Sequence, residues 1–335
     1  QPAMQAFCYG EGTAAAYDMA LRVAPDQVPY FEKATREYYY ETLIQNYTTY
    51  YGLHFSFKLS KEINYVEDFL KSIEHEIKNS NLQLQLSYLT LSLSVFRTDE
   101  MFENLRSFLI EHENKLSREE LATGYASISN YCVNQNRRGR SEFGRIKFEI
   151  DQIIIKKRLR VEGDFLNTLY FVNVARNAIW INELDWTEKF ITDYSPQVNP
   201  EQIQPHLNLL NAELLLYRGK YEDALRILAT IKYTSVPAQL MVKQLSLMAY
   251  YLIDEFERFN NFSENLKYYL RKDDEMTEER KKSFLFFLSV LNKLFKYRMM
   301  PEQEKLIEIE NEINSSEFVL RVEWLREQVH NLRKK

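Results

Sequence analysis

Residues 212–228 read AELLLYRGKYEDALRIL, and this stretch decides the fold class. Apolar residues recur three and four positions apart on both sides of Gly219, which predicts two amphipathic helices joined by a short turn. Ala212 and Ala224 are small enough to let the two helices cross closely, and the ring of Tyr221 fills the angle between them. The stretch therefore predicts one helix-turn-helix unit.

The order of these residues resembles a tetratricopeptide repeat (TPR), and Pro237 stands near the end of the unit, as is common in that family. With Tyr221 as the anchor, aromatic residues recur at steps of 37, 41, 43, 35 and 35 residues. The last two steps fit the TPR period of about 34, whereas the earlier steps need longer helices or loops. Only the unit around Tyr221 matches the family pattern well, so the array is TPR-like. The anchors are Tyr65, Phe102, Phe143, Trp186, Tyr221 and Phe256.

From about residue 30 onward the same apolar spacing predicts one helix after another. Helix N-caps are expected at Ser60, Ser117, Ser141, Thr277 and Ser316. The resemblance implies an all-α fold, an α-solenoid of TPR-like helix-turn-helix repeats wound into a right-handed superhelix. The predicted helices are 30–51, 61–79, 82–96, 99–114, 118–136, 140–158, 163–182, 185–193, 200–217, 220–232, 236–252, 255–271, 276–298, 301–314 and 316–333.

The chain divides into three predicted parts. Residues 1–29 are Ala-rich and contain no Lys, so this segment can be separate from the solenoid. Residues 30–300 carry the TPR-like repeats. Residues 301–335 are charge-rich helices with an apolar stripe, and we expect them to cap the end of the core.

Residues 118–295 also resemble an uncharacterised family of bacterial TPR-like proteins. The resembling pieces are Asn130-Tyr131-Cys132, Glu183–Trp186 with Phe190-Ile191, Gly219–Leu228 and Lys267–Arg271. This resemblance implies an architecture and supplies no activity.

Composition excludes several classes of protein. The 335 residues include only 8 Gly and 8 Pro, too few for the tight turns of a β-sandwich, a barrel or a Gly-looped Rossmann domain. The two cysteines indicate a reducing compartment, or a fold that needs no disulfide, and we expect a cytoplasmic protein. No apolar run reaches about 18 residues, so we expect no membrane span. The chain begins at Gln1, which we interpret as the start of a fragment or a processed product.

Catalytic motifs are missing from the sequence. It contains no HExxH, GxSxG, Walker A or CxxC pattern, and its five His show no ligand spacing. We therefore expect no enzyme, no cofactor and no metal site. Cys132 is expected to be a buried core thiol.

Three asparagines occupy one register position. Asn130, Asn173 and Asn208 each lie 13 residues before an anchor aromatic, so all three fall at the same place on the first helix of successive units. An Asn side chain both donates and accepts hydrogen bonds, and a row of them could clamp the backbone of an extended peptide. The alternative is that they hydrogen-bond neighbouring helices or loops. A second pair, Asn134 and Asn177, is expected to pack between helices.

Basic residues gather between 137 and 160, in a protein of net charge -5. They could attract an acidic partner or a nucleic-acid backbone, or they could form a solvated face. The acidity of the whole chain makes a dedicated nucleic-acid binder the weaker choice. The patch residues are Arg137, Arg138, Arg140, Lys156, Lys157 and Arg158.

These observations favour a non-enzymatic protein-interaction scaffold that binds a peptide or protein segment in the concave groove of the solenoid. The alternatives are a regulator that binds nucleic acid or an acidic ligand through residues 137–160, an enzyme with a site assembled from distant residues, and a structural subunit of a larger assembly. The partner and the oligomeric state are left open by the sequence.

Overall fold

The computed structural model describes residues 28–57, 65–232, 236–273, 276–316 and 320–334. The Ala-rich segment predicted at 1–29 therefore lies almost wholly outside the described residues, as does the N-cap expected at Ser60. The described residues form two compact units, and the chain passes from the first to the second between Ser127 and Ile128.

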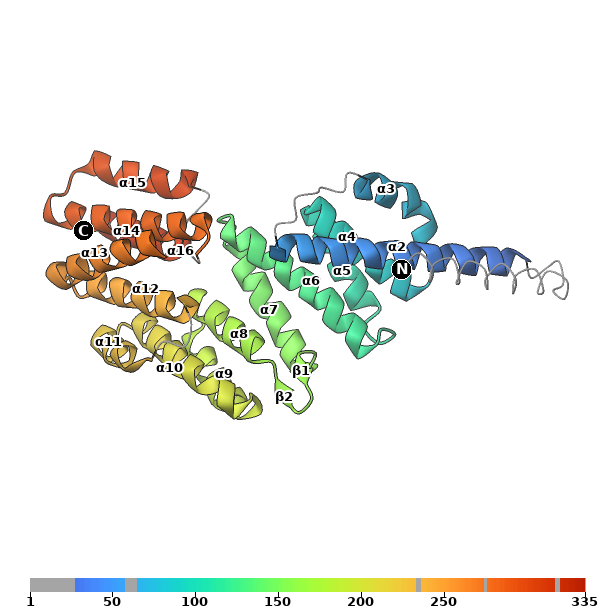
Figure 1. Cartoon of the computed structure of the whole chain (residues 1–335), viewed down its shortest axis with the longest axis horizontal. Coiled ribbons are helices and arrows are strands. Elements are labelled where there is room, and N and C mark those ends of the chain that lie inside the picture. Colours follow the sequence, from blue (N-terminus) through green and yellow to red (C-terminus); the bar gives the residue numbers. More distant parts are fainter. Residues whose placement is uncertain (1–27, 58–64, 233–235, 274–275, 317–319, 335) are drawn as a thin grey trace. The chain divides into compact units, whose positions relative to one another are not determined.

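The first unit consists of helices (Figure 1). Ile44, Leu70, Leu84 and Leu91 are almost fully buried in its core. The helices are α2 (Val28–Phe57), α3 (Val66–Ile77), α4 (Leu82–Phe96), α5 (Asp99–Glu111) and the first half of α6 (Arg118–Arg137).

The second unit holds the rest of α6 and a run of helix pairs (Figure 1). Helix α8 contacts α9, α10 contacts α11, α12 contacts α13 and α14 contacts α15, and α10 also contacts α8 and α12. The elements are α7 (Glu142–Lys156), β1 (Val161–Glu162), β2 (Phe165–Leu166), α8 (Thr168–Trp180), α9 (Leu184–Tyr194), η2 (Ser195–Gln197), α10 (Pro200–Tyr217), α11 (Tyr221–Thr230), α12 (Val236–Leu252), α13 (Phe256–Lys272), α14 (Glu278–Met299), α15 (Gln303–Ser315) and α16 (Val322–Arg333).

The all-α prediction is confirmed for the described residues, apart from one short hairpin. No described helix is both long enough and apolar enough to cross a lipid bilayer.

The unit around Tyr221 has the local features that the sequence predicts. Ala212 on α10 and Ala224 on α11 are both fully buried, and the two helices contact each other. Gly219 adopts φ +76°, a left-handed conformation that ends α10 without the strain a side chain would bring. Tyr221 is the first residue of α11.

The other anchor aromatics stand at comparable places. Phe102, Phe143, Trp186 and Phe256 lie within the first four residues of α5, α7, α9 and α13. Tyr65 is the exception, because it stands at the N-cap of α3 and is 75% exposed. The aromatic spacing therefore locates the starts of the second helices, although not every anchor fills a gap between helices.

The predicted N-caps have different outcomes. Ser117 and Glu120 form a reciprocal capping box at the start of α6, with the Glu120 N–H donating to Ser117 Oγ at 3.2 Å. Thr277 caps α14, and Ser141 stands at the N-cap of α7 without a side-chain hydrogen bond. The cap expected at Ser316 is wrong: Ser316 follows α15, and Arg321 precedes α16.

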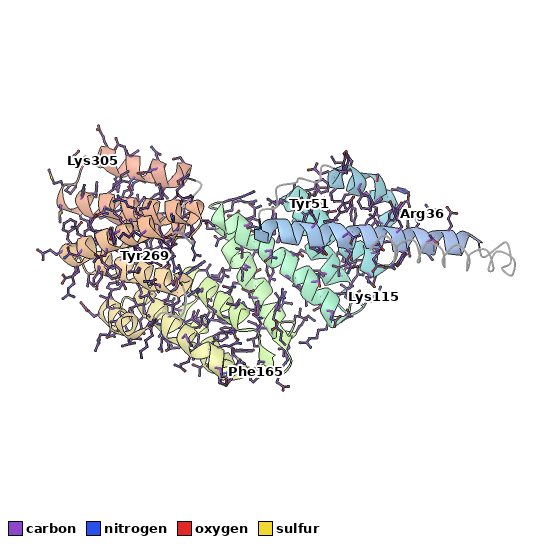
Figure 2. The ribbon with its side chains drawn as sticks, in the orientation of Figure 1. Arg36, Tyr51, Lys115, Phe165, Tyr269 and Lys305 are labelled. Carbon is purple, nitrogen blue, oxygen red and sulfur yellow. The ribbon has the colours of Figure 1, made fainter. Side chains whose placement is uncertain are left out.

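The helix expected over 163–182 starts late. Residues 161–166 form a hairpin instead, with Val161 opposite Leu166 and Gly163 at φ +59° in the turn. Phe165 next to this turn is exposed (Figure 2). Asn167 then caps α8 by accepting a hydrogen bond from the Tyr170 N–H at 2.9 Å. Two-residue strands give no alternating pattern, so the spacing of apolar residues could not predict them.

Candidate functional site

The three register asparagines lie on the first helices of successive pairs, as the sequence predicts. Asn130 on α6 and Asn173 on α8 are exposed, and Asn208 on α10 is half-buried. Within the described residues, none of these three side chains forms a hydrogen bond, in contrast to Asn177. Asn177 is buried and donates its Nδ2–H to the carbonyl of Gly144 at 3.1 Å, which confirms its expected packing role.

One face of α8 is open to solvent although it carries large apolar groups. Leu169 is 66% exposed and Trp180 is 43% exposed, and Asn173 and Arg176 lie between them. These four residues, which we call the α8 stripe, recur at helical spacing and therefore lie along one side of the helix. An exposed Leu and Trp on one helix face provide apolar contact area, and Asn173 and Arg176 provide polar groups for orientation.

Trp180, at the C-terminal end of the α8 stripe, contacts a buried charged group on α10. Glu213 is fully buried, and its Oε1 accepts a hydrogen bond from Trp180 Nε1 at 2.8 Å. Arg321 Nη1 lies 2.6 Å from the same oxygen, and Arg176 Nε lies 3.3 Å from Oε2. We call Arg176, Glu213 and Arg321 the arginine–glutamate cluster.

Electrostatics keep Glu213 ionised in this buried position. Burial alone raises the pKa of a carboxyl group, but here Arg321, Arg176 and the Trp180 hydrogen bond outweigh it and lower the pKa of Glu213. Breaking such a pair would leave a buried charge without its partner, which is costly. The cluster therefore holds α8, α10 and the segment before α16 together.

Arg321 comes from the segment just before α16. Its backbone is left-handed at φ +57°, and its guanidinium stacks over the Trp180 ring at 4.7 Å from the centroid. Its Nε and Nη2 also contact the side chains of Gln244 and Met241 on α12, at 3.5 and 3.4 Å. One arginine therefore joins the C-terminal segment to three first helices, α8, α10 and α12.

Helix α16 continues along the first helices. The ring of Trp324 packs against Tyr251 on α12 and Phe287 on α14, with centroids 5.8 and 6.4 Å away. Arg326 Nη1 donates to the carbonyl of Gly139, in the turn between α6 and α7, at 3.4 Å. The first-helix face thus already holds one amphipathic helix of this chain.

Sequence reasoning missed this arrangement. The available signal was Glu213 itself, a single carboxylate between Ala212 and Leu214 in a stretch predicted to be buried. The positions of Arg321 and Trp324 gave no comparable signal, because their partners lie far away along the chain.

The basic residues of 137–160 do not form one patch. Arg138 and Arg140 precede α7, whereas Lys156, Lys157 and Arg158 stand at its other end, roughly 20 Å away at 1.5 Å per residue. Arg140 is paired with Glu142 at 2.9 Å. The side chain of Arg137 is outside the description.

The middle of α7 does not connect these two groups. Lys147 is buried there and bonds Asp151 Oδ2 at 2.5 Å. Burial raises the pKa of Asp151, and Lys147 opposes that rise. The helix therefore presents two separate basic ends.

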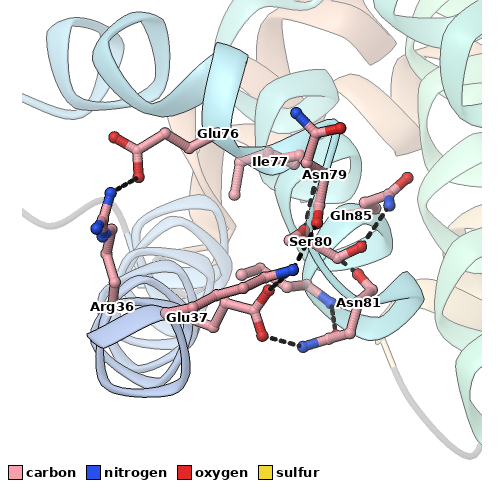
Figure 3. A network of polar contacts seen from close by, with 10 residues as sticks. Arg36, Glu37, Glu76, Ile77, Asn79, Ser80, Asn81 and Gln85 are labelled. Atoms are coloured by element: carbon pink, nitrogen blue, oxygen red, sulfur yellow. Dashed lines mark hydrogen bonds and ion pairs between the residues drawn. The ribbon is translucent and has the colours of Figure 1, made fainter. Parts of the chain in front are cut away.

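The first unit contains a cavity of about 340 Å³ between α2, α3 and α4 (Figure 3). Its rim is closed by polar contacts: Arg36 bonds Glu76 at 3.1 Å, and Glu37 accepts from Asn81 Nδ2 at 3.3 Å. Lys33 Nζ donates to the Asn79 carbonyl at 3.1 Å. These contacts attach α2 to α3 and the turn after it, which is a structural role.

A second cavity of about 410 Å³ lies between α14 and α15. Met299, Met300 and Ile309 supply much of its apolar lining. Lys293 on its rim is paired with Glu312 at 2.5 Å.

No sequence family, curated protein or solved structure matches this chain in the three comparisons made.

Proposed function

We propose that this chain is a non-enzymatic interaction scaffold that binds an extended peptide segment of a partner protein. The binding face is formed by the first helices α6, α8 and α10. The proposal includes the TPR-like arrangement, a right-handed solenoid whose first helices line the concave side. Asn130, Asn173 and Asn208 are the proposed clamp residues.

One observation carries the proposal: the first helices already receive a helix of this chain. Arg321 and Trp324 from the C-terminal segment contact α8, α10, α12 and α14 through a buried ion pair and aromatic contacts. The same kind of face continues along α8 from Trp180, which Arg321 contacts, toward Leu169. There it presents exposed Leu169, the side chain of Asn173 and half of Trp180.

The chemistry of the α8 stripe suits a peptide. A peptide backbone offers alternating donors and acceptors, and an Asn amide can satisfy one of each. Leu169 and Trp180 offer apolar surface at either end, about 16 Å apart along the helix at 1.5 Å per residue. That length matches about five residues of an extended peptide.

The test uses peptides selected from a displayed random library on the full chain. We expect a selected peptide to lose at least tenfold in affinity for the Asn130→Ala, Asn173→Ala, Asn208→Ala variant. The matched control replaces three exposed asparagines of the second helix α13, with Asn260→Ala, Asn261→Ala and Asn265→Ala, and keeps full affinity. Equal losses in both variants, or no loss in either, would refute the proposed face.

A further inference from the structure

The arginine–glutamate cluster contains two guanidiniums and one carboxylate. Among the described residues, Glu213 is the one carboxylate within ion-pair distance of Arg176 or Arg321. Among the neighbouring titratable groups, the exposed carboxylate of Glu327 acts on Tyr217, but no described ion pair joins it to Arg176 or Arg321. Burial, then Arg176, lowers the pKa of His206, so its imidazole is neutral, and burial raises the pKa of Tyr217 to about 12. The three members of the cluster, Arg176, Arg321 and Glu213, therefore sum to one net positive charge that is largely withdrawn from bulk water.

Chemistry favours an anion beside such a cluster. A charge withheld from water is costly unless it is paired and hydrogen-bonded. An arginine offers a planar fork of donors, which fits a carboxylate in two parallel hydrogen bonds. Gln244 adds a further donor, because its Nε2 is buried and donates to no other described residue.

The cluster is open on one side. The side chain of Arg176 is 17% exposed, whereas that of Arg321 is 6% exposed and that of Glu213 is fully buried. Trp180 beside it is also partly exposed. Arg176 is therefore the member of the cluster that an anion approaching along the α8 stripe meets first.

We propose that the cluster binds a second carboxylate, supplied by an acidic side chain of the segment that occupies the α8 stripe. This inference rests on the proposed function and names the chemistry of the partner. Arg176 follows Asn173 by one turn of α8, a rise of about 4.5 Å. The acidic residue of the partner thus lies next to the peptide unit that Asn173 clamps.

The test titrates the full chain with a capped tetraglutamate peptide and, separately, with acetate, at fixed ionic strength balanced by chloride. The midpoint of thermal unfolding and the tryptophan fluorescence are recorded. We expect saturable binding of tetraglutamate by the wild type, and weaker saturable binding of acetate. Capped tetraglutamine serves as the neutral comparison and gives no response.

Two variants and a control make the test specific. Arg176→Gln is expected to weaken tetraglutamate binding at least tenfold, and Arg176→Lys to weaken it by an intermediate factor because it keeps the charge and loses the fork. The control Arg145→Gln removes an exposed charge that is paired with Glu183 on the surface. We expect this variant to bind tetraglutamate as the wild type does. Equal binding by Arg176→Gln, or no saturable response of the wild type, overturns the inference. If Arg176→Gln does not fold, Arg176→Lys decides alone, and wild-type affinity in that variant overturns the inference.

The two proposals fail in distinguishable ways. A selected peptide that depends on the three asparagines but binds equally to Arg176→Gln would leave the scaffold function standing and overturn the second carboxylate. In the opposite case, tetraglutamate binding is saturable and needs Arg176, but the selected peptides bind equally well without the three asparagines. That result would leave the second carboxylate standing and overturn the proposed peptide face.

Discussion

Arg321 and Glu213 form a buried ion pair, with Nη1 and Oε1 2.6 Å apart, that ties the C-terminal segment to the first helix α10. Because both side chains are withdrawn from water, removal of one partner leaves the other charge uncompensated. The pair therefore adds a charged contact to the aromatic packing of Trp324 that holds α16 on the first helices.

Glu213→Gln is expected to lower the free energy of unfolding of residues 128–335 by about 3–5 kcal/mol, because it strands two buried guanidiniums. Chemical denaturation of the full chain, followed by tryptophan fluorescence, measures the change. The control Glu188→Gln alters an exposed pair with Arg218 and is expected to cost less than about 1 kcal/mol. A cost for Glu213→Gln as small as that of the control would contradict the role given to the cluster.

The paired charges also predict a coupling. The variant with both Glu213→Gln and Arg321→Gln is expected to be more stable than the sum of the two single losses implies, since no carboxylate faces an absent partner. A double-mutant cycle gives the coupling energy directly. Strict additivity would show that the two side chains do not interact in solution.

Acid is expected to weaken the cluster. The pKa of Glu213 is lowered in the folded chain relative to its ordinary 4.5, so its contribution to stability is present above that value. The contribution is lost as the pH falls further, through the folded pKa. Asp151 has the opposite effect on stability, because burial raises its pKa. Its protonation in acid removes the free-energy cost of holding a buried negative charge. A stability profile between pH 6 and pH 3 should fall more steeply for the wild type than for Glu213→Gln.

Alkali is expected to destabilise the second unit through its buried tyrosines. Burial raises the pKa of Tyr217 and of Tyr251 from 10.0 to about 12. A raised folded pKa means that the stabilisation is complete below pH 10 and is lost as the pH rises toward 12. Unfolding curves between pH 9 and pH 11.5 should show this loss, and Tyr217→Phe should reduce its slope. An unchanged slope in that variant would assign the loss to other groups.

The two asparagine registers predict opposite outcomes for stability. Asn177→Ala removes a buried amide that bonds the Gly144 carbonyl, and it is expected to cost about 1–3 kcal/mol. Asn173→Ala changes an exposed side chain one turn away and is expected to stay within about 0.5 kcal/mol of the wild type. Thermal unfolding of both variants tests the contrast. If the two variants changed the free energy of unfolding equally, the exposure of an asparagine would not show whether its amide stabilises the core or is available to bind a partner.

The sequence predicted most helix positions because a helix that buries one side repeats its apolar residues at a fixed period. The start of α11 at Tyr221 and the burial of Ala212 and Ala224 follow from that period. The hairpin at 161–166 was missed because two-residue strands have no period to detect. The pairing of Arg321 with Glu213 was missed because it depends on how distant helices meet, which local spacing does not encode.

Asn130, Asn173 and Asn208 lie on α6, α8 and α10. Whether they bind a peptide is a prediction. Spacing could not show that Leu169 and Trp180 are left exposed beside Asn173, since the same spacing is typical of a packed face.

The most direct test of the proposed binding face is site-specific photo-crosslinking to a library-selected peptide. A photoreactive phenylalanine analogue replaces Leu169 on α8 in one protein and Tyr268 on α13 in another, two positions that are 66% and 58% exposed. We expect a crosslink from position 169, abolished by an excess of unlabelled peptide, and none from position 268. A crosslink from position 268 alone, or equal crosslinks from both, would contradict it.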